Sequence, residues 1–115
     1  MRVRIPFAFN VGNKTLPAGD YTVTVSNPTS DRRVLRLRSK DGRASAVIQT
    51  NGAEANEPAD AKLVFNRYGD TYFFAQAQMA GDTTMLMAVK TKAERHKERE
   101  ITSNRSKTKV EVFAE

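Results

Sequence analysis

Residues Tyr21-Thr22-Val23-Thr24-Val25 alternate strictly between side chains that suit a buried face and side chains that tolerate water. Val34-Leu35-Arg36-Leu37-Arg38 repeats this alternation with longer polar side chains. Successive side chains of a strand point to opposite faces of a sheet, so both runs predict antiparallel strands with one buried and one exposed face. The same alternation continues outward in both directions along the chain.

Seven such runs precede residue 90, and turns rich in Gly, Asp and Asn separate them. The expected strands cover residues 2–9, 21–26, 33–40, 44–50, 62–68, 71–79 and 83–89, and an eighth covers Lys109–Phe113. Loops are expected over residues 10–20, 27–31, 51–60 and 80–82, with Leu16 reaching into the core. The predicted fold class is all-β: about eight antiparallel strands in a sandwich or small closed barrel, with one helix before the C-terminal strand.

Two tight turns set the expected register. Asp41-Gly42 has the composition of a two-residue type I′ turn. This turn pairs Lys40 with Arg43, Leu37 with Ala46 and Leu35 with Ile48. Gly69-Asp70 suits a type II′ turn and pairs Phe65 with Phe74 and Arg67 with Tyr72. The predicted core is therefore Val23, Leu35, Leu37, Ile48, Phe65 and Phe74.

Pro6 and Lys90 mark changes in the pattern. Pro6 cannot donate to a sheet ladder, so the first strand is expected at an edge or at a bulge. Beyond Lys90, residues 91–100 are mostly helix formers, with Thr91 as the cap and Glu94 at the capping-box position. Because Ala93 and Ile101 are its apolar residues, this helix is expected to rest lightly on the domain. The chain thus divides into a β core (1–89), a basic helix and linker (90–107) and a strand that completes or exchanges into the sheet (108–115).

Composition limits the classes of function. The chain has 115 residues, which suits a single domain, and no Cys, which excludes disulfides, thiolate metal sites and a Cys nucleophile. No apolar run approaches the roughly 20 residues that span a bilayer, and no signal-peptide segment is expected before the first strand. The net charge is +6, of which residues 90–109 carry +5, residues 1–89 carry +3 and residues 110–115 carry −2.

The strongest candidate for binding is a basic face. Arg36, Arg38, Lys40 and Arg43 are expected on the outer side of one strand pair, where they could bind phosphates or an acidic polysaccharide. Small β proteins that bind nucleic acid usually place exposed aromatics among such charges, and there are none between Arg36 and Arg43, which disfavours nucleic acid. The alternative is a charged exterior that keeps the sheet soluble.

No metal, cofactor or catalytic residue is predicted. His96 is interpreted as a solvated helix residue, and Met79, Met85 and Met87 as core or interface side chains. The Asp residues beside Gly (Asp20, Asp41, Asp70 and Asp82) fit turns and do not have the spacing of a calcium loop. Since no acid–base pair or nucleophile stands out, the chain is expected not to be an enzyme.

Residues 6–23, PFAFNVGNKTLPAGDYTV, resemble the opening of a group of small secreted bacterial proteins of unassigned function. The resemblance continues in residues 35–44 (LRLRSKDGRA), 62–73 (KLVFNRYGDTYF) and 92–95 (KAER). It implies an extracellular or periplasmic location and supplies no active site. Separately, residues 16–23 are similar to the opening strand of prealbumin-like and collagen-adhesin-type β-sandwich repeats, which bears on the fold.

These observations support two functions of different classes. The first is a non-enzymatic exported structural or interaction module that self-associates into an oligomer or filament. Its association would use a sheet edge or the C-terminal strand, with Val110, Val112 and Phe113. The second is a small-ligand, glycan or polyanion binder that uses the mouth of a barrel or a sheet face. Its features would be the basic face and Tyr21, Tyr68 and Tyr72.

Overall fold

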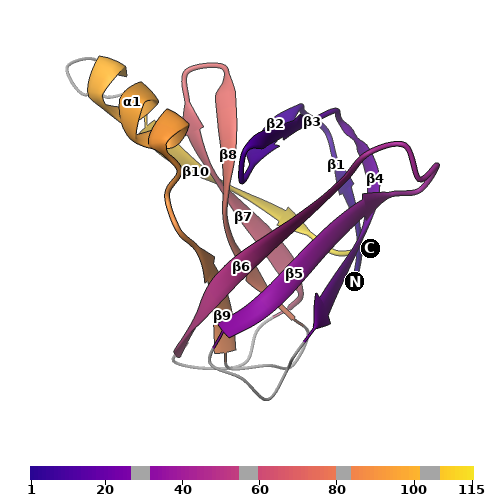
Figure 1. Cartoon of the computed structure of the whole chain (residues 1–115). Coiled ribbons are helices and arrows are strands. Elements are labelled where there is room, and N and C mark those ends of the chain that lie inside the picture. Colours follow the sequence, from indigo (N-terminus) through magenta and orange to yellow (C-terminus); the bar gives the residue numbers. More distant parts are fainter. Residues whose placement is uncertain (27–31, 55–59, 80–83, 102–106) are drawn as a thin grey trace.

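The computed structural model describes residues 1–26, 32–54, 60–79, 84–101 and 107–115 (Figure 1). These residues form ten strands and one helix: β1 (Arg2–Ile5), β2 (Phe9–Val11), β3 (Lys14–Leu16), β4 (Gly19–Ser26), β5 (Arg32–Ser39), β6 (Ser45–Glu54), β7 (Lys62–Tyr68), β8 (Thr71–Gln78), β9 (Thr84–Ala88), α1 (Lys92–Ile101) and β10 (Lys107–Phe113). The all-β class and the helix before the last strand are confirmed. The expected loop at 27–31, the turn at 80–82 and most of the linker after the helix lie outside the described residues.

Two strands more than expected arise near the N-terminus. The expected strand over residues 2–9 is divided into β1 and β2 at Pro6, which has no N–H to offer a ladder. Residues 10–20, expected to be a loop, contain β3, which pairs with β2 through a two-residue turn at Gly12-Asn13. Gly12 has a φ of +58°, which favours glycine. Leu16 at the end of β3 is buried, as predicted.

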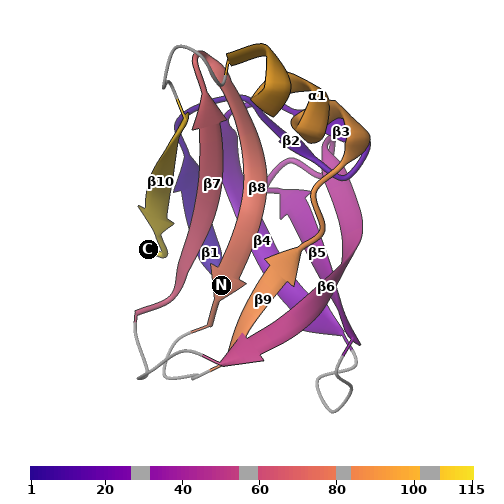
Figure 2. The ribbon, with the colours of Figure 1, turned by 90° about the vertical axis from the view of Figure 1, so that its left-hand side faces the viewer.

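All strands belong to one sheet, whose order is β1-β4-β5-β6-β9-β8-β2-β3, while β7 pairs with both β8 and β10. The pairs are antiparallel except β2 with β8, which is parallel, so the prediction of a wholly antiparallel sheet is wrong at this pair. No ladder of named strands joins β1 to β10 in the described ranges. A single bridge links Val3 with Ala114, and the Glu115 amide donates to the Arg2 carbonyl at 2.9 Å. The two chain ends therefore lie close together (Figure 2).

Both predicted hairpin registers are confirmed. Leu37 pairs with Ala46 and Leu35 with Ile48, while Phe65 pairs with Phe74 and Arg67 with Tyr72. The β5–β6 connection differs from the predicted two-residue turn, because the Gly42 amide donates to the Ser39 carbonyl at 3.0 Å and the ladder ends before Lys40. Residues 51–54, expected to be in a loop, continue β6 because they pair with β9.

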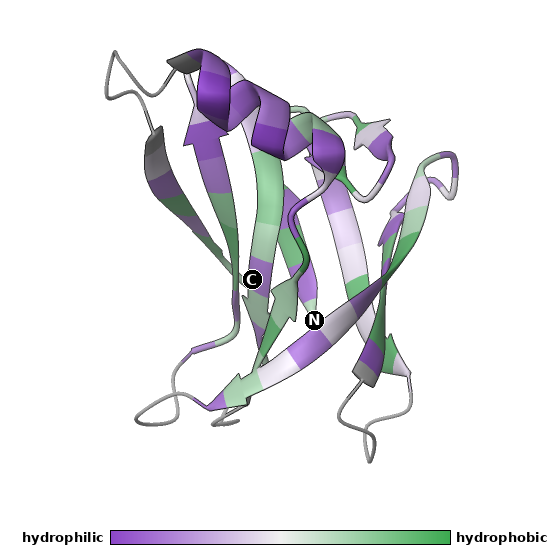
Figure 3. Cartoon of the chain, turned by 60° about the vertical axis from the view of Figure 1, so that its left-hand side comes forward, coloured by the Kyte–Doolittle hydropathy of each residue, from purple (hydrophilic) through white to green (hydrophobic). Residues whose placement is uncertain are grey.

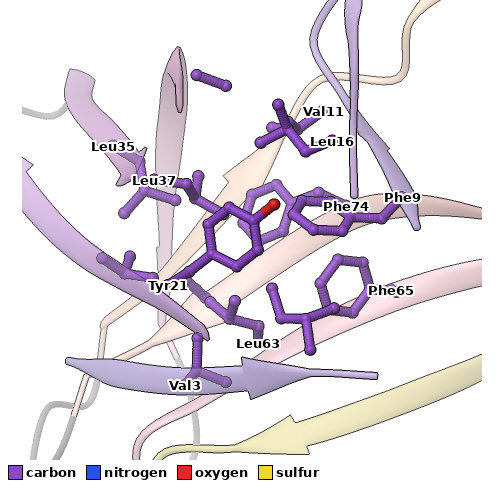
Figure 4. Close-up of a cluster of buried hydrophobic side chains, with 14 of the residues drawn as sticks. Val3, Phe9, Val11, Leu16, Tyr21, Leu35, Leu37, Leu63, Phe65 and Phe74 are labelled. Atoms are coloured by element: carbon purple, nitrogen blue, oxygen red, sulfur yellow. The ribbon is translucent and has the colours of Figure 1, made fainter. Parts of the chain in front are cut away.

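The main core lies between the inner faces of the curled sheet (Figure 4). Five of the six predicted core residues are buried, and Ile48 is half-buried. Aromatic rings pack against one another in the main core: the Phe9 ring centroid lies 5.4 Å from that of Tyr21 and 5.3 Å from that of Phe65. Rings at these separations and steep angles add to the stabilisation from burial.

The helix packs against the other face of β7 near its end, where Glu94 meets Asn66 and Tyr68. Val64, Tyr68 and Phe73 are buried outside the main core. Figure 3 shows most of α1 as hydrophilic, and Ala93 is exposed. The helix has few contacts with the sheet, as expected, but one of them buries a carboxylate, that of Glu94, against β7.

Candidate functional site

The four residues of the predicted basic face are all exposed. Arg36 and Arg38 alternate with buried Leu35 and Leu37 along β5, so they point to the outer side of the sheet. They are separated by two residues of strand, about 7 Å. Lys40 and Arg43 follow in the connection from β5 to β6. We call the surface formed by Arg36, Arg38, Lys40 and Arg43 the basic face.

The strand order adds Arg2 to this surface. In the ladders, Arg2 pairs with Thr22 and Thr22 pairs with Arg38. Adjacent strands lie about 4.8 Å apart, so the backbones of Arg2 and Arg38 are about 10 Å apart, with a short exposed threonine between them. The sequence pattern places Arg2 outward, but it does not show that β1 lies next to β4, so it does not assign Arg2 to the basic face.

Acidic residues near the basic face have partners of their own. The Asp20 carboxylate pairs with Arg4 Nε at 2.9 Å, and this hydrogen bond lowers the pKa of Asp20. The Asp41 carboxylate accepts from Ser39 Oγ at 2.6 Å and from the Arg43 amide at 3.0 Å, which lowers the pKa of Asp41. Within the described ranges, the four basic side chains form no ion pair. The charge of Lys40 nevertheless helps to lower the pKa of Asp20, and that of Arg43 helps to lower the pKa of Asp41. The charges of Arg36 and Arg38 are therefore the ones most available to an anion.

A groove of about 560 Å³ borders the basic face. Its lining combines Lys40 and Arg43 with Pro17, Ala18 and Tyr21, and it also includes the carboxylates Asp20 and Asp41. The groove therefore offers polar groups of both charges and apolar surface to a sugar ring.

The three tyrosines proposed as ligand contacts are not exposed platforms. Tyr21 is buried and donates its hydroxyl to the Pro17 carbonyl. Tyr68 is fully buried and donates to Glu94. Tyr72 is half-buried and stacks on Phe7 with 3.8 Å between the ring centroids. Tyr68 and Tyr72 are therefore used in packing, whereas Tyr21 also lines the groove beside the basic face.

The C-terminal strand is paired within its own chain. β10 forms seven residue pairs with β7, from Lys107 with Tyr68 to Phe113 with Lys62. Val110 and Val112 are half-buried, and Val112 packs against the main core. Phe113 lies on the opposite face and is 55 % exposed, with Lys62 Nζ 5.9 Å from its ring centroid.

A second cleft, of about 300 Å³, was not predicted from the sequence. It opens where β6 and β8 separate, because β9 pairs with β6 only from Thr50 onward and with β8 only from Gln76 onward. The turn between β2 and β3 and the start of α1 complete its border, and Glu94 is among its lining residues. We call it the Glu94 cleft.

Glu94 is held by the helix cap and by β7. Its amide donates to Thr91 Oγ1 at 3.1 Å, so the predicted cap is confirmed. Its side chain does not complete the predicted capping box. Instead its Oε2 accepts from Asn66 Nδ2 at 2.9 Å and from the Tyr68 hydroxyl at 2.8 Å, and the residue is 3 % exposed. Burial, and next the hydrogen bond to Glu94, raise the pKa of Tyr68 above its ordinary value.

The sequence contains one signal for this second buried face. Leu63, Val64 and Phe65 form a continuous apolar run, which is typical of strands covered on both sides. Nothing in the charged segment 92–100 singles out Glu94 from Glu98 and Glu100, so its partners become visible only when the helix is placed over β7.

The remaining candidates do not form a metal site in the part of the chain that the structure describes. His96 is exposed, as predicted, and lies 3.3 Å from the Glu100 carboxylate in the same helix. Met79, Met85 and Met87 are half-buried. No helix in the described ranges has the length and apolar character needed to cross a membrane.

Comparisons with protein-family models, with curated proteins and with solved structures found no match for this chain.

Proposed function

We propose that the protein is a non-enzymatic binding module and that its basic face binds an extended acidic polysaccharide. One observation carries the proposal: four cationic side chains are exposed together on a sheet, and none of them forms an ion pair with the described residues. Arg2 and the groove beside Lys40 and Arg43 extend this surface. Charge on such a surface attracts polyanions and speeds their association.

A polysaccharide is favoured over nucleic acid by the composition of the surface. Exposed aromatics on which bases stack are a usual part of single-strand binders, and the neighbours of Arg36 and Arg38 across β4 are Thr24 and Thr22. The resemblance to secreted bacterial proteins supports a location where acidic polysaccharides occur. In this proposal the curled sheet acts as a small barrel, held at β1 and β10 by the Val3–Ala114 bridge, and it binds on its outer wall.

The test is retention on immobilised heparin. Arg36, Arg38, Lys40 and Arg43 are replaced together by Gln, and the expected result is elution at clearly lower salt with an unchanged melting temperature. The control replaces four other basic residues by Gln: Lys92, Arg95, Arg99 and Lys109. It removes the same charge and is expected to elute close to the unmodified protein. If both variants elute at the same salt concentration, net charge and not the basic face explains retention, and the proposal fails.

Self-association is a second candidate function, favoured by the geometry of β10. Residues 107–113 make seven pairs with β7, whereas Ala114 makes a single bridge to β1. The same seven pairs can form with β7 of a second copy, and reciprocal exchange then gives a closed dimer. Light scattering across a range of concentrations tests this candidate. A dimer that disappears when residues 108–115 are deleted supports it, and a monomer at every concentration contradicts it.

A further inference from the structure

One oxygen of the Glu94 carboxylate, which lines the cleft, has no hydrogen-bond donor among the described residues. Both donors that reach the Glu94 carboxylate, Asn66 Nδ2 and the Tyr68 hydroxyl, bind Oε2. No donor among the described residues reaches Oε1. Two side-chain atoms among the described residues are sealed from solvent and have no hydrogen-bond partner: Arg33 Nε and Asn66 Oδ1. Glu94 Oε1 is not one of them. Glu94 Oε1 therefore still borders solvent, in a residue whose other atoms are almost entirely buried.

Asn66 holds the carboxylate from β7 and does not line the cleft. Its Oδ1 is sealed from solvent and has no hydrogen-bond partner among the described residues, so a ligand in the cleft does not reach it. The acceptor left for a ligand is Glu94 Oε1, and a carboxylate oxygen without a donor favours a ligand that supplies N–H groups.

The charges around the cleft leave Glu94 without a cation. Lys90 also lines the cleft, but its Nζ pairs with Glu98 at 2.8 Å. Arg95 and His96 follow Glu94 in the helix, and both are exposed to solvent. The start of α1 favours a negative charge at this position, but it supplies no unit charge. A cationic ligand in the cleft would therefore pair with the Glu94 carboxylate.

The walls of the cleft are mixed. Phe73, Phe74, Ile48 and Val89 supply apolar surface, and the remaining lining residues include Asn10, Asn13, Gln49, Lys90 and Thr91. A volume of about 300 Å³ is at the lower end of small-molecule pockets. The ligand body that fits is small, with an apolar part that can pack on the two phenylalanines.

We propose that the Glu94 cleft binds a small organic cation, an ammonium group on a compact apolar body, with the ammonium donating to Glu94 Oε1. This site is separate from the basic face and does not depend on the proposed function. The alternative is that Glu94 serves only to hold α1 on β7. A purely structural role needs Oε2 and its two donors, and it gives no preference for charge in the cleft.

The test uses three probes of similar shape and different charge: benzylamine, benzyl alcohol and benzoate. Amide signals of residues 48–49 and 88–91 are followed by NMR near neutral pH during titration. Benzylamine is expected to cause saturable shifts there and to bind about ten-fold more tightly than benzyl alcohol. Benzoate is expected to cause no shifts at these residues. The Glu94→Gln variant keeps the shape of the side chain and is expected to bring the amine and the alcohol within about two-fold of each other.

A matched pair of valine variants keeps the test decisive if Glu94→Gln loosens the helix. Val89→Trp adds bulk at the border of the cleft and keeps Glu94 and its two donors in the chain, and it is expected to weaken benzylamine binding at least about ten-fold. Val47→Trp is the control, because Val47 is similarly exposed, at 56 %, and lies outside the cleft. The proposal is overturned if benzylamine gives no saturable shift, if benzoate binds as well as benzylamine, or if the two Trp variants bind alike.

Discussion

Leu37 shows how a single side chain anchors this sheet. It is fully buried, it pairs with Val23 on one side and Ala46 on the other, and its neighbours Arg36 and Arg38 face solvent. We expect Leu37→Ala to lower the free energy of unfolding by about 2–5 kcal/mol, because it leaves a cavity in the core. Urea denaturation measures this loss. Arg36→Ala is the control, with an expected change within about 0.5 kcal/mol. A Leu37→Ala loss as small as that of the control would contradict the inward assignment.

Tyr68 is the residue through which Glu94 is held most directly. Tyr68→Phe removes one of the two donors to a buried carboxylate and is expected to destabilise the protein by about 1.5–3 kcal/mol. Tyr72→Phe is the matched control, since the Tyr72 hydroxyl donates to none of the described residues. Equal melting temperatures for the two variants would show that the Tyr68 hydroxyl contributes nothing.

Tyr68 also predicts a pH dependence. Burial favours its neutral form, so the pKa of Tyr68 is raised in the folded protein above its value in the unfolded chain. The unfolded chain therefore loses the proton first, and this contribution to stability is complete below about pH 10 and falls as the pH rises beyond it. Denaturation at increasing pH is expected to show a shallower alkaline decline for Tyr68→Phe than for the unmodified protein. Parallel declines in the stability of the two proteins would contradict this pH dependence.

At the scale of elements, α1 depends on polar contacts more than on apolar burial. It is a charged helix of ten residues, a length that is marginal in isolation. Thr91 caps the helix, and Glu94, three residues later, accepts a hydrogen bond from Asn66 of β7. Two positions within one turn therefore fix the start of the helix and its contact with β7. The sequence shows the cap because capping is local, and it hides the docking because the partners lie on another element.

The C-terminal strand predicts the effect of a deletion. Removing residues 108–115 takes away most of the β10 ladder with β7, the Val3–Ala114 bridge and the packing of Val112. We expect the melting temperature to fall by at least about 5 °C, since each kcal/mol corresponds to several degrees in a domain of this size. Circular dichroism during heating measures it. The control changes exposed Phe113 to Ser and keeps the strand; an unchanged melting temperature in the deletion would show that β10 is dispensable.

For the whole molecule, the β core of residues 1–89 depends on the helix and on the last strand. Tyr68 is buried where Glu94 of α1 meets β7, its ring contacts that of Phe73, and β10 occupies one edge of β7. A protein that ends at Lys90 is therefore expected to expose these rings and this edge. It should bind the dye ANS strongly and melt without a sharp transition. A cooperative transition and weak dye binding would instead establish residues 1–90 as a self-sufficient domain.

Much of the fold can be predicted from the sequence because its signals are local. Alternation gives the strands and their inner faces, and the turns at Asp41-Gly42 and Gly69-Asp70 give two registers, since pairing across a short turn is obtained by counting. The exposure of Arg36 and Arg38 is a consequence of the same alternation. The hairpin of β2 and β3 is also predictable in principle, because Gly12-Asn13 is a two-residue hairpin turn flanked by Val11 and Lys14.

By itself, then, the sequence determined the all-β class, the inward residues of the long strands, the helix cap and the exposed charges of β5, because each depends on neighbours within a few positions. Only the tertiary structure decided that β1 lies beside β4, that β2 runs parallel to β8 and that Glu94 meets Asn66 and Tyr68. These contacts join residues up to about 60 positions apart (Asn10 with Phe73, for example), and no local pattern specifies them. The burial of a carboxylate becomes favourable only where two distant donors are already in place.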